Sequence, residues 1–293
     1  MSIAVIINPV AGRARGDRAS ERALLAAAVI ERLGEQAEVF ITERSGHARD
    51  LAAAAAAGGA RLVVAWGGDG TVNEVASALA FDDVPLGVIP AGSGNGLARE
   101  LGIDLRPERA LADAIRAVPK PVDLGELGGH LFVNTAGAGI DAYIAAQFNA
   151  GNSKRGFTGY LRIGARALVS YAPVLYTVTA GNQRLVVRAV AVVVANSAQY
   201  GNGARIAPGA RVDDGELDLV IVEERSRLAT LARTPHLFRG TLAKVPGCSI
   251  RRIREATIEA AEPVLFHVDG EPIAGGTILS ARVHPGALRI CVK

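Results

Sequence analysis

A hydrophobic run at residues 62–65 leads into a glycine-rich turn and then into a helical pattern, and this order constrains the fold most. The turn reads Gly67-Gly68-Asp69-Gly70, and apolar residues recur at helical spacing from 72 to 79. Glycines let the backbone approach a ligand closely, and the amino end of a helix offers N–H groups to an anion. Because the Asp69 carboxylate would repel bare phosphate, a divalent cation between the two is expected. The turn therefore predicts a triphosphate site that uses Mg²⁺.

The first 118 residues or so alternate between strand and helix patterns. Strands are predicted at 3–7, 37–41, 62–65 and 86–89, and helices at 18–33, 47–57, 72–79, 97–101 and 108–118. This alternation is typical of a parallel sheet covered by helices. Ligands of such sheets bind at the carboxyl ends of the strands, where each glycine-rich turn of this chain falls.

After Pro119-Lys120-Pro121 the pattern changes to short runs in which apolar and polar residues alternate. Strands are predicted at 130–135, 174–180, 184–195, 216–222, 256–260, 264–268, 278–283 and 287–292, with helices near 158–168 and 228–238. Such alternation is typical of half-buried antiparallel strands. We therefore expect an α/β nucleotide-binding domain at 1–122 and an antiparallel β-sandwich domain at 123–283. The strand at 284–293 is a candidate to return to the first domain.

The 293 residues carry a net charge of only +3 and no lysine- or arginine-rich tract with aromatics, which argues against nucleic acid as a partner. The two cysteines, Cys248 and Cys291, have no metal-ligand spacing and are expected to be reduced thiols. The amino terminus lacks the pattern of a signal peptide, and no apolar run has the length of a membrane span. We therefore expect a cytoplasmic protein with at most peripheral membrane contact, and leave a homodimer open.

Three glycine-containing turns follow three of the predicted parallel strands, at 8–12, 67–74 and 90–96. Each alone is a common structural turn, but three at one sheet edge predict a shared cleft. It would offer amide donors, the Ser93 hydroxyl and the side chains of Asn8 and Asn95. No turn has the Gly-Lys-Ser/Thr ending of a P-loop, and the first turn lacks the dinucleotide fingerprint.

Further motifs extend this set along the chain. In order they are Ile7-Asn8-Pro9 with Gly12, Gly67 to Val75, Pro90-Ala91-Gly92-Ser93-Gly94-Asn95, Val122-Asp123-Leu124-Gly125, Ile206-Ala207-Pro208, Asp213-Asp214-Gly215-Glu216-Leu217-Asp218 and Val268-Asp269-Gly270-Glu271. Over essentially its full length the chain resembles the diacylglycerol kinase and sphingosine kinase superfamily, in particular its bacterial soluble lipid kinases. The Gly-Gly-Asp-Gly core alone is shared with NAD kinases and phosphofructokinases, so the ordered set carries the resemblance.

The resemblance implies ATP and Mg²⁺ as cofactors, a long-chain lipid as acceptor at the membrane surface, and an active site in the cleft between the two domains. Its implied nucleotide-binding residues are Asn8, Thr42, Gly67, Gly68, Asp69, Gly70, Thr71, Val72, Asn73, Glu74, Gly92, Ser93 and Asn95. Glu271 matches the proposed general base, and Asp69 the acid of the catalytic magnesium network. A carboxylate base suits a hydroxyl acceptor, whose proton must leave as phosphate is transferred.

The resemblance also implies metal-binding residues. Asp123 would support Asp69 in the catalytic network, and a second, structural Mg²⁺ would use the Asp214 carboxylate with the backbone carbonyls of Arg211 and Glu216. From the sequence pattern alone, Asp69 could also be a helix-capping residue, and Glu271 an ordinary acid after an Asp-Gly hairpin turn.

Two other functions stay open at this stage: an NAD kinase-like enzyme acting on a soluble nucleotide, and a non-catalytic lipid-binding protein. A nucleotide acceptor would need a ribose- and adenine-reading site, whereas a lipid would need an apolar groove in the second domain. Retention of Asp69 and Glu271 argues against a non-catalytic protein. The Gly92-Ser93-Gly94-Asn95 turn is closer to the sphingosine and ceramide kinase branch, which weakly favours a sphingoid acceptor over diacylglycerol.

Overall fold

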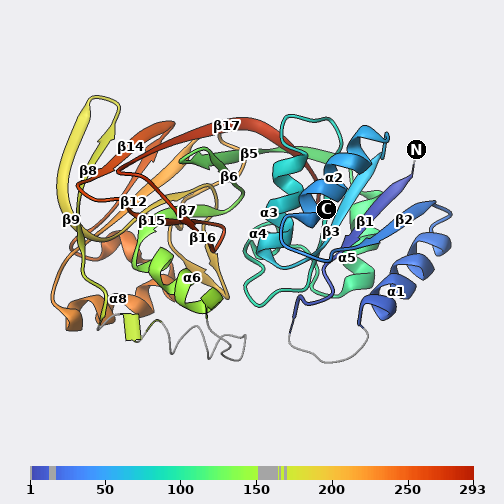
Figure 1. Ribbon diagram of the computed structural model, residues 1–293, viewed down its shortest axis with the longest axis horizontal. Coiled ribbons are helices and arrows are strands. Elements are labelled where there is room, and N and C mark those ends of the chain that lie inside the picture. Colours follow the sequence, from blue (N-terminus) through green and yellow to red (C-terminus); the bar gives the residue numbers. More distant parts are fainter. Residues whose placement is uncertain (1, 13–17, 151–163, 165, 168–169) are drawn as a thin grey trace. The chain divides into compact units, whose positions relative to one another are not determined.

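A computed structural model of the chain describes residues 2–12, 18–150, 164, 166–167 and 170–293 (Figure 1). The chain divides into two compact units. The first comprises residues 1–122 with 286–293, and the second comprises residues 123–285. The boundaries fall inside two strands, β5 (Pro119–Leu127) and β17 (Ile278–Cys291).

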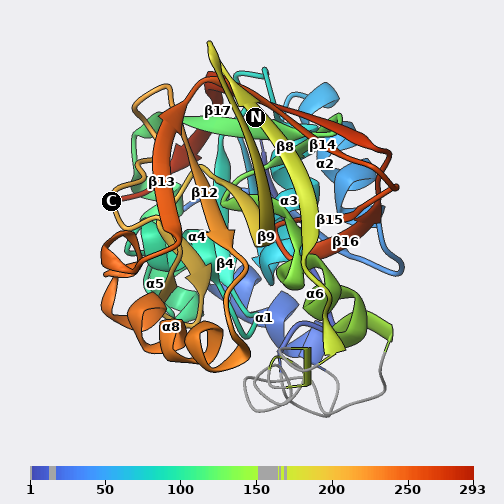
Figure 2. The same cartoon turned by 90° about the vertical axis from the view of Figure 1, so that its left-hand side faces the viewer.

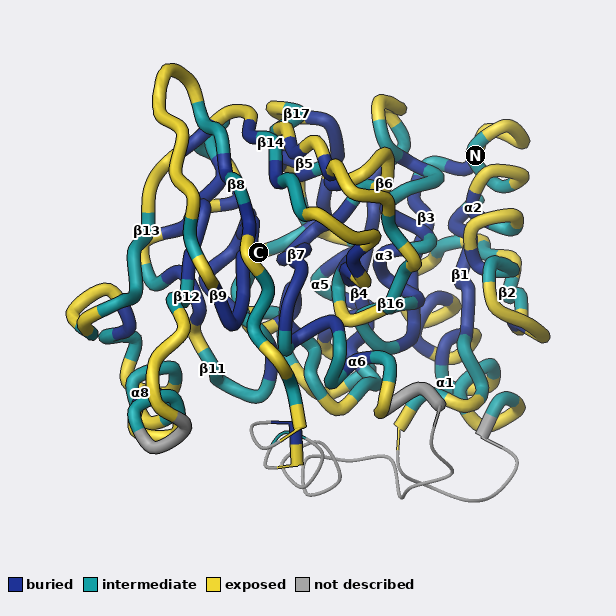
Figure 3. The backbone as a smooth tube through the Cα atoms, turned by 60° about the vertical axis from the view of Figure 1, so that its left-hand side comes forward, coloured by how far each residue is buried: buried dark blue, intermediate teal, exposed yellow. Residues whose placement is uncertain are grey.

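The first unit is built on a parallel sheet in the order β2-β1-β3-β4-β17. Its strands are β1 (Ile3–Ile7), β2 (Ala37–Ile41), β3 (Leu62–Gly67), β4 (Leu86–Pro90) and the last part of β17. The central strands β1 and β3 are buried along their whole length, as Figure 3 shows in dark blue. Burial on both faces explains their continuous apolar sequences.

Helices cover both faces of this sheet (Figure 1). Helices α1 (Arg18–Arg32) and α5 (Pro107–Arg116) pack on one face, and α2 (His47–Ala57) and α3 (Asp69–Ala78) pack against each other on the opposite face. The short α4 (Gly96–Glu100) follows β4. Helix α3 begins at Asp69, three residues before the predicted start, because its first turn contains Gly70 and lacks the apolar spacing seen from Val72 onward.

The second unit is an antiparallel β-sandwich. Its strands are the second part of β5, β6 (His130–Phe132), β7 (Thr135–Gly139), β8 (Val174–Ala180), β9 (Gln183–Ala195), β10 (Gln199–Gly201), β11 (Ala204–Arg205), β12 (Leu217–Glu223), β13 (Cys248–Ile253), β14 (Glu255–Ala260), β15 (Leu265–Val268), β16 (Glu271–Ala274) and the first part of β17. Figure 2 shows β13, β12, β9 and β8 side by side, each paired antiparallel with the next. Helices α6 (Ile140–Ala150) and α8 (Arg227–Arg239) and the 3₁₀ turn η1 (Leu242–Lys244) complete the unit.

The core of the second unit is formed by inward-facing side chains from most of its strands. Phe132, Tyr176 and Phe266 are its largest fully buried members. Burial raises the pKa of Tyr176 above its ordinary value, as expected for a phenol in apolar surroundings. A separate apolar cluster, including Val193, lies on the other face of β9.

The α/β and β-sandwich architecture is confirmed, while several elements differ from the sequence expectation. Residues 130–135 form β6 and the start of β7, with a turn between them, and the two runs at 278–283 and 287–292 form the single strand β17. The helix predicted at 228–238 is confirmed as α8. The helix predicted at 158–168 lies outside the described residues, apart from three isolated positions.

Two further expectations concern cysteines and membrane spans. Cys248 and Cys291 are both free thiols, and burial raises the pKa of Cys291 to about 11. None of the helices in the described part of the chain is both long enough and apolar enough to cross a bilayer.

Candidate active site

Four turns of the first unit lie at one edge of its parallel sheet, where β1, β2, β3 and β4 end. Backbone hydrogen bonds hold neighbouring turns in register: the Asn8 N–H donates to the Trp66 carbonyl at 2.9 Å, and the Thr42 N–H donates to the Ile7 carbonyl at 2.9 Å. The Ala91 N–H donates to the Gly67 carbonyl at 2.8 Å. The sheet therefore brings together Asn8, Thr42, the Gly67 turn and the Gly92 turn, as the sequence predicted for the three glycine-containing turns.

Asp69 connects the turn after β3 to the turn after β4. Its carboxylate accepts the N–H of Asn95 at 2.9 Å and the N–H of Gly96 at 2.6 Å. The Asn95 side chain in turn braces its own loop, because Oδ1 accepts the Gly92 N–H and Nδ2 donates to the Gly92 carbonyl. Hydrogen bonds to a charged acceptor are stronger than neutral ones. Asp69 therefore fixes the third turn, whatever further role it has.

Helix α3 reaches the other two turns through Glu74 and Thr71. The Glu74 carboxylate accepts the N–H groups of Gly46, at 2.8 Å, and Ala48, at 3.1 Å, at the start of α2. The Thr71 hydroxyl accepts a hydrogen bond from Asn8 Nδ2 at 2.9 Å. Glu74 therefore positions the backbone at the start of α2, and Asn8, whose Oδ1 accepts the Val10 N–H at 3.0 Å, ties its own turn to Thr71. With Asp69, these contacts make α3 the common support of all the turns at this edge.

The glycines at this edge of the sheet lie where there is little or no room for a Cβ atom. A Cβ at Gly67 would lie 2.5 Å from the Thr71 side chain, and a Cβ at Gly68 would lie 3.3 Å from the Gly92 Cα. The first distance is far below ordinary van der Waals contact. Two backbone segments therefore run close together here, with no side chains between them.

Gly92→Ala tests this close approach. The added Cβ would lie 2.7 Å from the Gly68 Cα and 3.0 Å from the Asn95 Oδ1, so the two turns must separate. We expect the free energy of unfolding to fall by about 1–3 kcal/mol. ATP binding measured by calorimetry should also weaken, and each 1.4 kcal/mol of lost binding free energy corresponds to about a tenfold higher Kd. Gly209→Ala is the control, because nothing lies within 4 Å of its added Cβ. Unchanged ATP affinity in folded Gly92→Ala would contradict a role for this contact in the nucleotide site.

The start of α3 fits a phosphate group. Gly68 is the N-cap residue, and no side chain caps this end of the helix through a hydrogen bond. The first N–H groups of a helix have no partner within it, and the helix dipole favours an anion there. Thr71, Val72 and Asn73 are buried, so their side chains belong to the interior, whereas Ser93 is exposed. An anion bound at this end of α3 would therefore contact mainly backbone N–H groups.

In the second unit, Asp123 is buried and hydrogen-bonded to the loop between β11 and β12. Its carboxylate accepts the Gly215 N–H at 2.7 Å, and its own N–H donates to the Val212 carbonyl at 2.6 Å. Asn196 Nδ2 donates to the carbonyls of Asp123 and Val133, both at 2.8 Å. Asn196 is a supporting residue that sequence reasoning missed, because its partners lie more than 60 residues away in the chain.

The loop that follows Val212 is acidic. The Asp214 carboxylate accepts the Glu216 N–H at 3.1 Å, and Arg211 pairs with Asp213 at 3.2 Å. Burial raises the pKa of Asp218, with Arg252 opposing this shift and the Asp214 and Glu216 carboxylates adding to it. No group of three or more His, Cys, Asp or Glu side chains suited to a metal occurs among the residues that the structure describes. A cation here would therefore need backbone carbonyls or water as further ligands.

Glu271 follows a tight turn between β15 and β16. Asp269 and Gly270 both have positive φ angles, 46° and 86°, and Val268 pairs with Glu271 across the hairpin. Two residues with positive φ are typical of a type I′ turn, which the Asp-Gly pair predicted. The Asp269 carboxylate accepts the N–H groups of residues 133–135 at 2.8, 2.8 and 3.1 Å. The exposed Glu271 side chain is thus carried by a firmly held turn.

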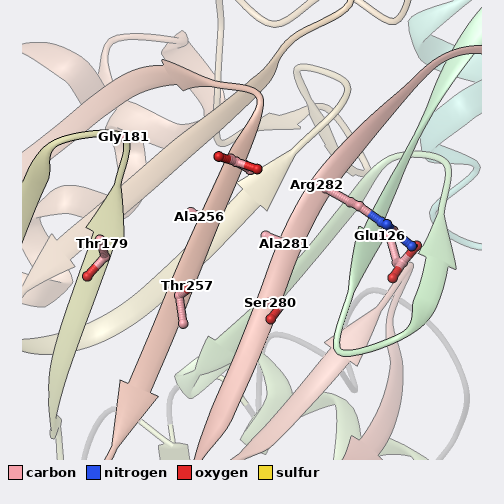
Figure 4. Close-up of a pocket in the computed structure, with 9 residues that line it drawn as sticks. Glu126, Thr179, Gly181, Ala256, Thr257, Ser280, Ala281 and Arg282 are labelled. Atoms are coloured by element: carbon pink, nitrogen blue, oxygen red, sulfur yellow. The ribbon is translucent and has the colours of Figure 1, made fainter.

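A polar depression of about 360 Å³ lies on the sheet of the second unit (Figure 4). It is lined by Glu126, Thr179, Gly181, Glu255, Ala256, Thr257, Ser280, Ala281 and Arg282, and Arg282 donates two hydrogen bonds to Glu126. None of the candidate site residues lines it. Its polar walls do not match the apolar groove that a lipid chain requires. We therefore do not assign it to the active site.

Comparisons with known proteins agree with this arrangement. Residues 2–127 match the family model of the diacylglycerol kinase catalytic domain, and residues 134–292 match that of the YegS C-terminal NAD kinase beta sandwich-like domain. A probable lipid kinase YegS-like from Pseudomonas aeruginosa is 34% identical over 287 residues, covering 94% of this chain and 91% of that protein. A diacylglycerol kinase from Mycobacterium tuberculosis is 28% identical over 276 residues, covering 92% and 88%. A crystal structure of a diacylglycerol kinase from Bacillus anthracis shares the fold, with a TM-score of 0.74, 21% identity and coverage of 100% and 97%.

The fold and the family models thus define a kinase with an α/β catalytic domain and a β-sandwich domain. The chain belongs to the diacylglycerol kinase family of lipid kinases. It is a lipid kinase and uses ATP as the phosphate donor. The resemblance inferred from the ordered motifs is confirmed, and the two alternative functions are not favoured.

Proposed function

We propose that this kinase transfers the γ-phosphate of ATP to a primary hydroxyl of a long-chain lipid in a reaction that requires Mg²⁺. The proposal that the first unit binds ATP depends mainly on one observation. Helix α3 supports the set of turns through Asp69, Thr71 and Glu74. Phosphoryl transfer depends more on positioning and charge neutralisation than on covalent chemistry. A rigid frame of backbone N–H groups suits that requirement.

ATP would be held mainly by backbone. The first N–H groups of α3, from Asp69 to Thr71, would face the phosphates, with Gly68 and Gly92 providing the close approach. The exposed Ser93 hydroxyl would add a side-chain donor, and Thr42 would contact the nucleotide from the turn after β2.

A catalytic Mg²⁺ would use Asp69, supported by Asp123. Each Asp69 oxygen already accepts one backbone N–H and can accept further contacts. Mg²⁺ characteristically takes one or two carboxylates and completes its shell with water and phosphate oxygens. The donor set present here fits that habit. When bound, the ion would neutralise charge on the phosphate oxygens.

A second, structural Mg²⁺ would use the Asp214 carboxylate and the carbonyls of Arg211 and Glu216. The acidic loop supports this proposal, because the Asp214 carboxylate already accepts the Glu216 N–H and lies beside the carbonyls that would complete the site. Asp214→Asn should lower the thermal stability gained on adding Mg²⁺. An unchanged Mg²⁺-dependent gain in that variant would contradict the second site.

Glu271 would act as the general base. Its carboxylate would take the proton from the acceptor hydroxyl as that oxygen bonds to the γ-phosphorus and the bond to the β-phosphate oxygen breaks, releasing ADP. Such assistance is typically worth about 10²–10⁴ in rate. The support for this role is the held turn that carries the exposed carboxylate.

Peripheral contact with a lipid surface is part of this proposal. Leu231 and Phe238 on α8 are 54% and 48% exposed, and exposed apolar side chains favour an interface. Another apolar segment, 157–168, lies outside the described residues apart from positions 164, 166 and 167. We propose a cytoplasmic location and leave the homodimer as a hypothesis.

The acceptor is the first point to test. We propose a sphingoid base or ceramide as the preferred class, because of the Gly92-Ser93-Gly94-Asn95 turn, and diacylglycerol as the second class. The protein should be incubated with ATP, Mg²⁺ and a panel of sphingosine, ceramide, diacylglycerol and NAD, with products identified by mass. A phosphorylated sphingoid lipid is expected. Phosphorylated diacylglycerol alone would overturn the sphingoid preference, and phosphorylated NAD alone would overturn the lipid acceptor.

A further inference from the structure

A buried polar cluster lies next to the turn that carries Glu271. It consists of Asp141 at the start of α6, Tyr200 in β10 and His267 in β15. Asp141 and His267 are only 9% and 4% exposed. The Asp141 Oδ2 accepts the Tyr200 hydroxyl at 2.8 Å and lies 3.0 Å from His267 Nε2. Buried polar groups of this kind require partners, and these three provide them for one another.

The far side of the His267 ring contacts the Glu271 turn. The Gly270 N–H donates to His267 Nδ1 at 3.3 Å, so Nδ1 must be the unprotonated, accepting nitrogen. Nε2 then carries the proton and donates to Asp141 Oδ2. Only a neutral imidazole with its proton on Nε2 satisfies both contacts. In a protonated ring, the Nδ1–H would face the Gly270 N–H, and two donors cannot form a hydrogen bond.

Asp141 sets this tautomer because it is held as a carboxylate. Its Oδ2 accepts from Tyr200 and His267, and its Oδ1 accepts the Ala142 N–H at 2.9 Å. Both carboxylate oxygens are engaged inside the unit.

We propose that His267 is a positioning residue for Glu271, which holds the turn through the Gly270 N–H and is itself oriented by Asp141 and Tyr200. This inference rests on the proposed role of Glu271 as general base. The turn is then fixed at both of its residues: Asp269 by the N–H groups of residues 133–135, and Gly270 by the imidazole. Two residues with positive φ, one of them an aspartate, need such support.

Two substitutions separate the contacts of His267. In His267→Asn, the amide oxygen can lie near the position of Nδ1 and accept from Gly270, while the contact to Asp141 is lost. In His267→Gln, the longer amide can reach Asp141 but leaves the Gly270 N–H without its acceptor. Because a small misplacement of a catalytic group can cost about 10² in rate, His267→Gln should lower kcat by about that factor with the KM for ATP unchanged. His267→Asn should retain most of the wild-type kcat.

A measurement on the wild-type protein does not depend on either variant folding. Nitrogen-15 NMR of the imidazole should show an unprotonated Nδ1 and a protonated Nε2, and the Gly270 amide should exchange slowly with solvent. Full activity of His267→Gln, alongside an inactive Glu271→Gln, would overturn the positioning role of His267. The proposed role of Glu271 as general base would stand. Full activity of Glu271→Gln would overturn both. A proton on Nδ1 in the wild type would overturn the proposed contact directly.

Discussion

Asp69→Asn is expected to lower phosphate transfer by about 10²–10³ and to weaken ATP binding at the same time. The carboxylate accepts two backbone N–H groups, from Asn95 and Gly96, and the amide can offer only one acceptor atom in its place. The other N–H would then face the amide nitrogen, which is itself a donor. The turn after β4 should therefore move away from α3, and the negative charge proposed for Mg²⁺ is lost as well. Transfer of labelled phosphate from ATP to lipid, with calorimetry for ATP, measures both effects.

The fold should survive this change. Losing a hydrogen bond to a charged group costs about 1.5–3 kcal/mol, which is a fraction of the stability of a typical domain. Asp83→Asn is the matched control, because Asp83 belongs to the same unit and its side chain is 92% exposed in an ion pair with Arg289. Wild-type transfer by a folded Asp69→Asn would show that phosphate transfer needs neither the turn held by this carboxylate nor a metal bound to it.

Glu271→Gln is expected to lower kcat by about 10²–10⁴ while leaving ATP affinity unchanged. The amide keeps the size of the side chain and cannot take a proton from the acceptor hydroxyl. The hairpin should be unaffected, because the turn is held by Asp269 and Gly270. Single-turnover transfer to lipid, with ATP binding measured on the same sample, separates chemistry from binding.

Glu262→Gln controls for the loss of one exposed glutamate from the same unit. It should transfer phosphate at the wild-type rate. If Glu271→Gln instead lost ATP affinity and turnover in equal measure, Glu271 would belong to the nucleotide site, and the base would have to be sought elsewhere.

The sequence predicted that the glycine-rich turns of the first unit meet at one edge of its sheet, because the signals for this are local. Each glycine-rich turn directly follows its strand, and parallel strands bring their carboxyl ends to one edge. The same reasoning could not predict that Asp69, Thr71 and Glu74 support the other turns, since their partners lie 26–63 residues away. Those residues were expected to contact ATP. In the structure the carboxylates of Asp69 and Glu74 accept backbone N–H groups, and the Thr71 hydroxyl accepts from the Asn8 side chain.

The second unit was predicted less completely, for identifiable reasons. Strand β13 contains Arg251 and Arg252, which mask an apolar pattern, and β16 begins with Glu271-Pro272. Strand β5 begins with Pro119-Lys120-Pro121, which resembles a linker in sequence, although proline is tolerated at the first residue of a strand. Only the Asp-Gly pair before Glu271 gave a local signal for the turn that the structure contains.

We propose that the first unit binds ATP and that Glu271 of the second unit acts as the general base in phosphate transfer. The most direct test measures ATP affinity and single-turnover phosphate transfer for wild type, Asp69→Asn and Glu271→Gln side by side. We expect Asp69→Asn to lose both ATP affinity and transfer, whereas Glu271→Gln should bind ATP as wild type does and lose only transfer. Equal effects of the two substitutions on ATP affinity, or wild-type transfer by Glu271→Gln, would contradict this proposal.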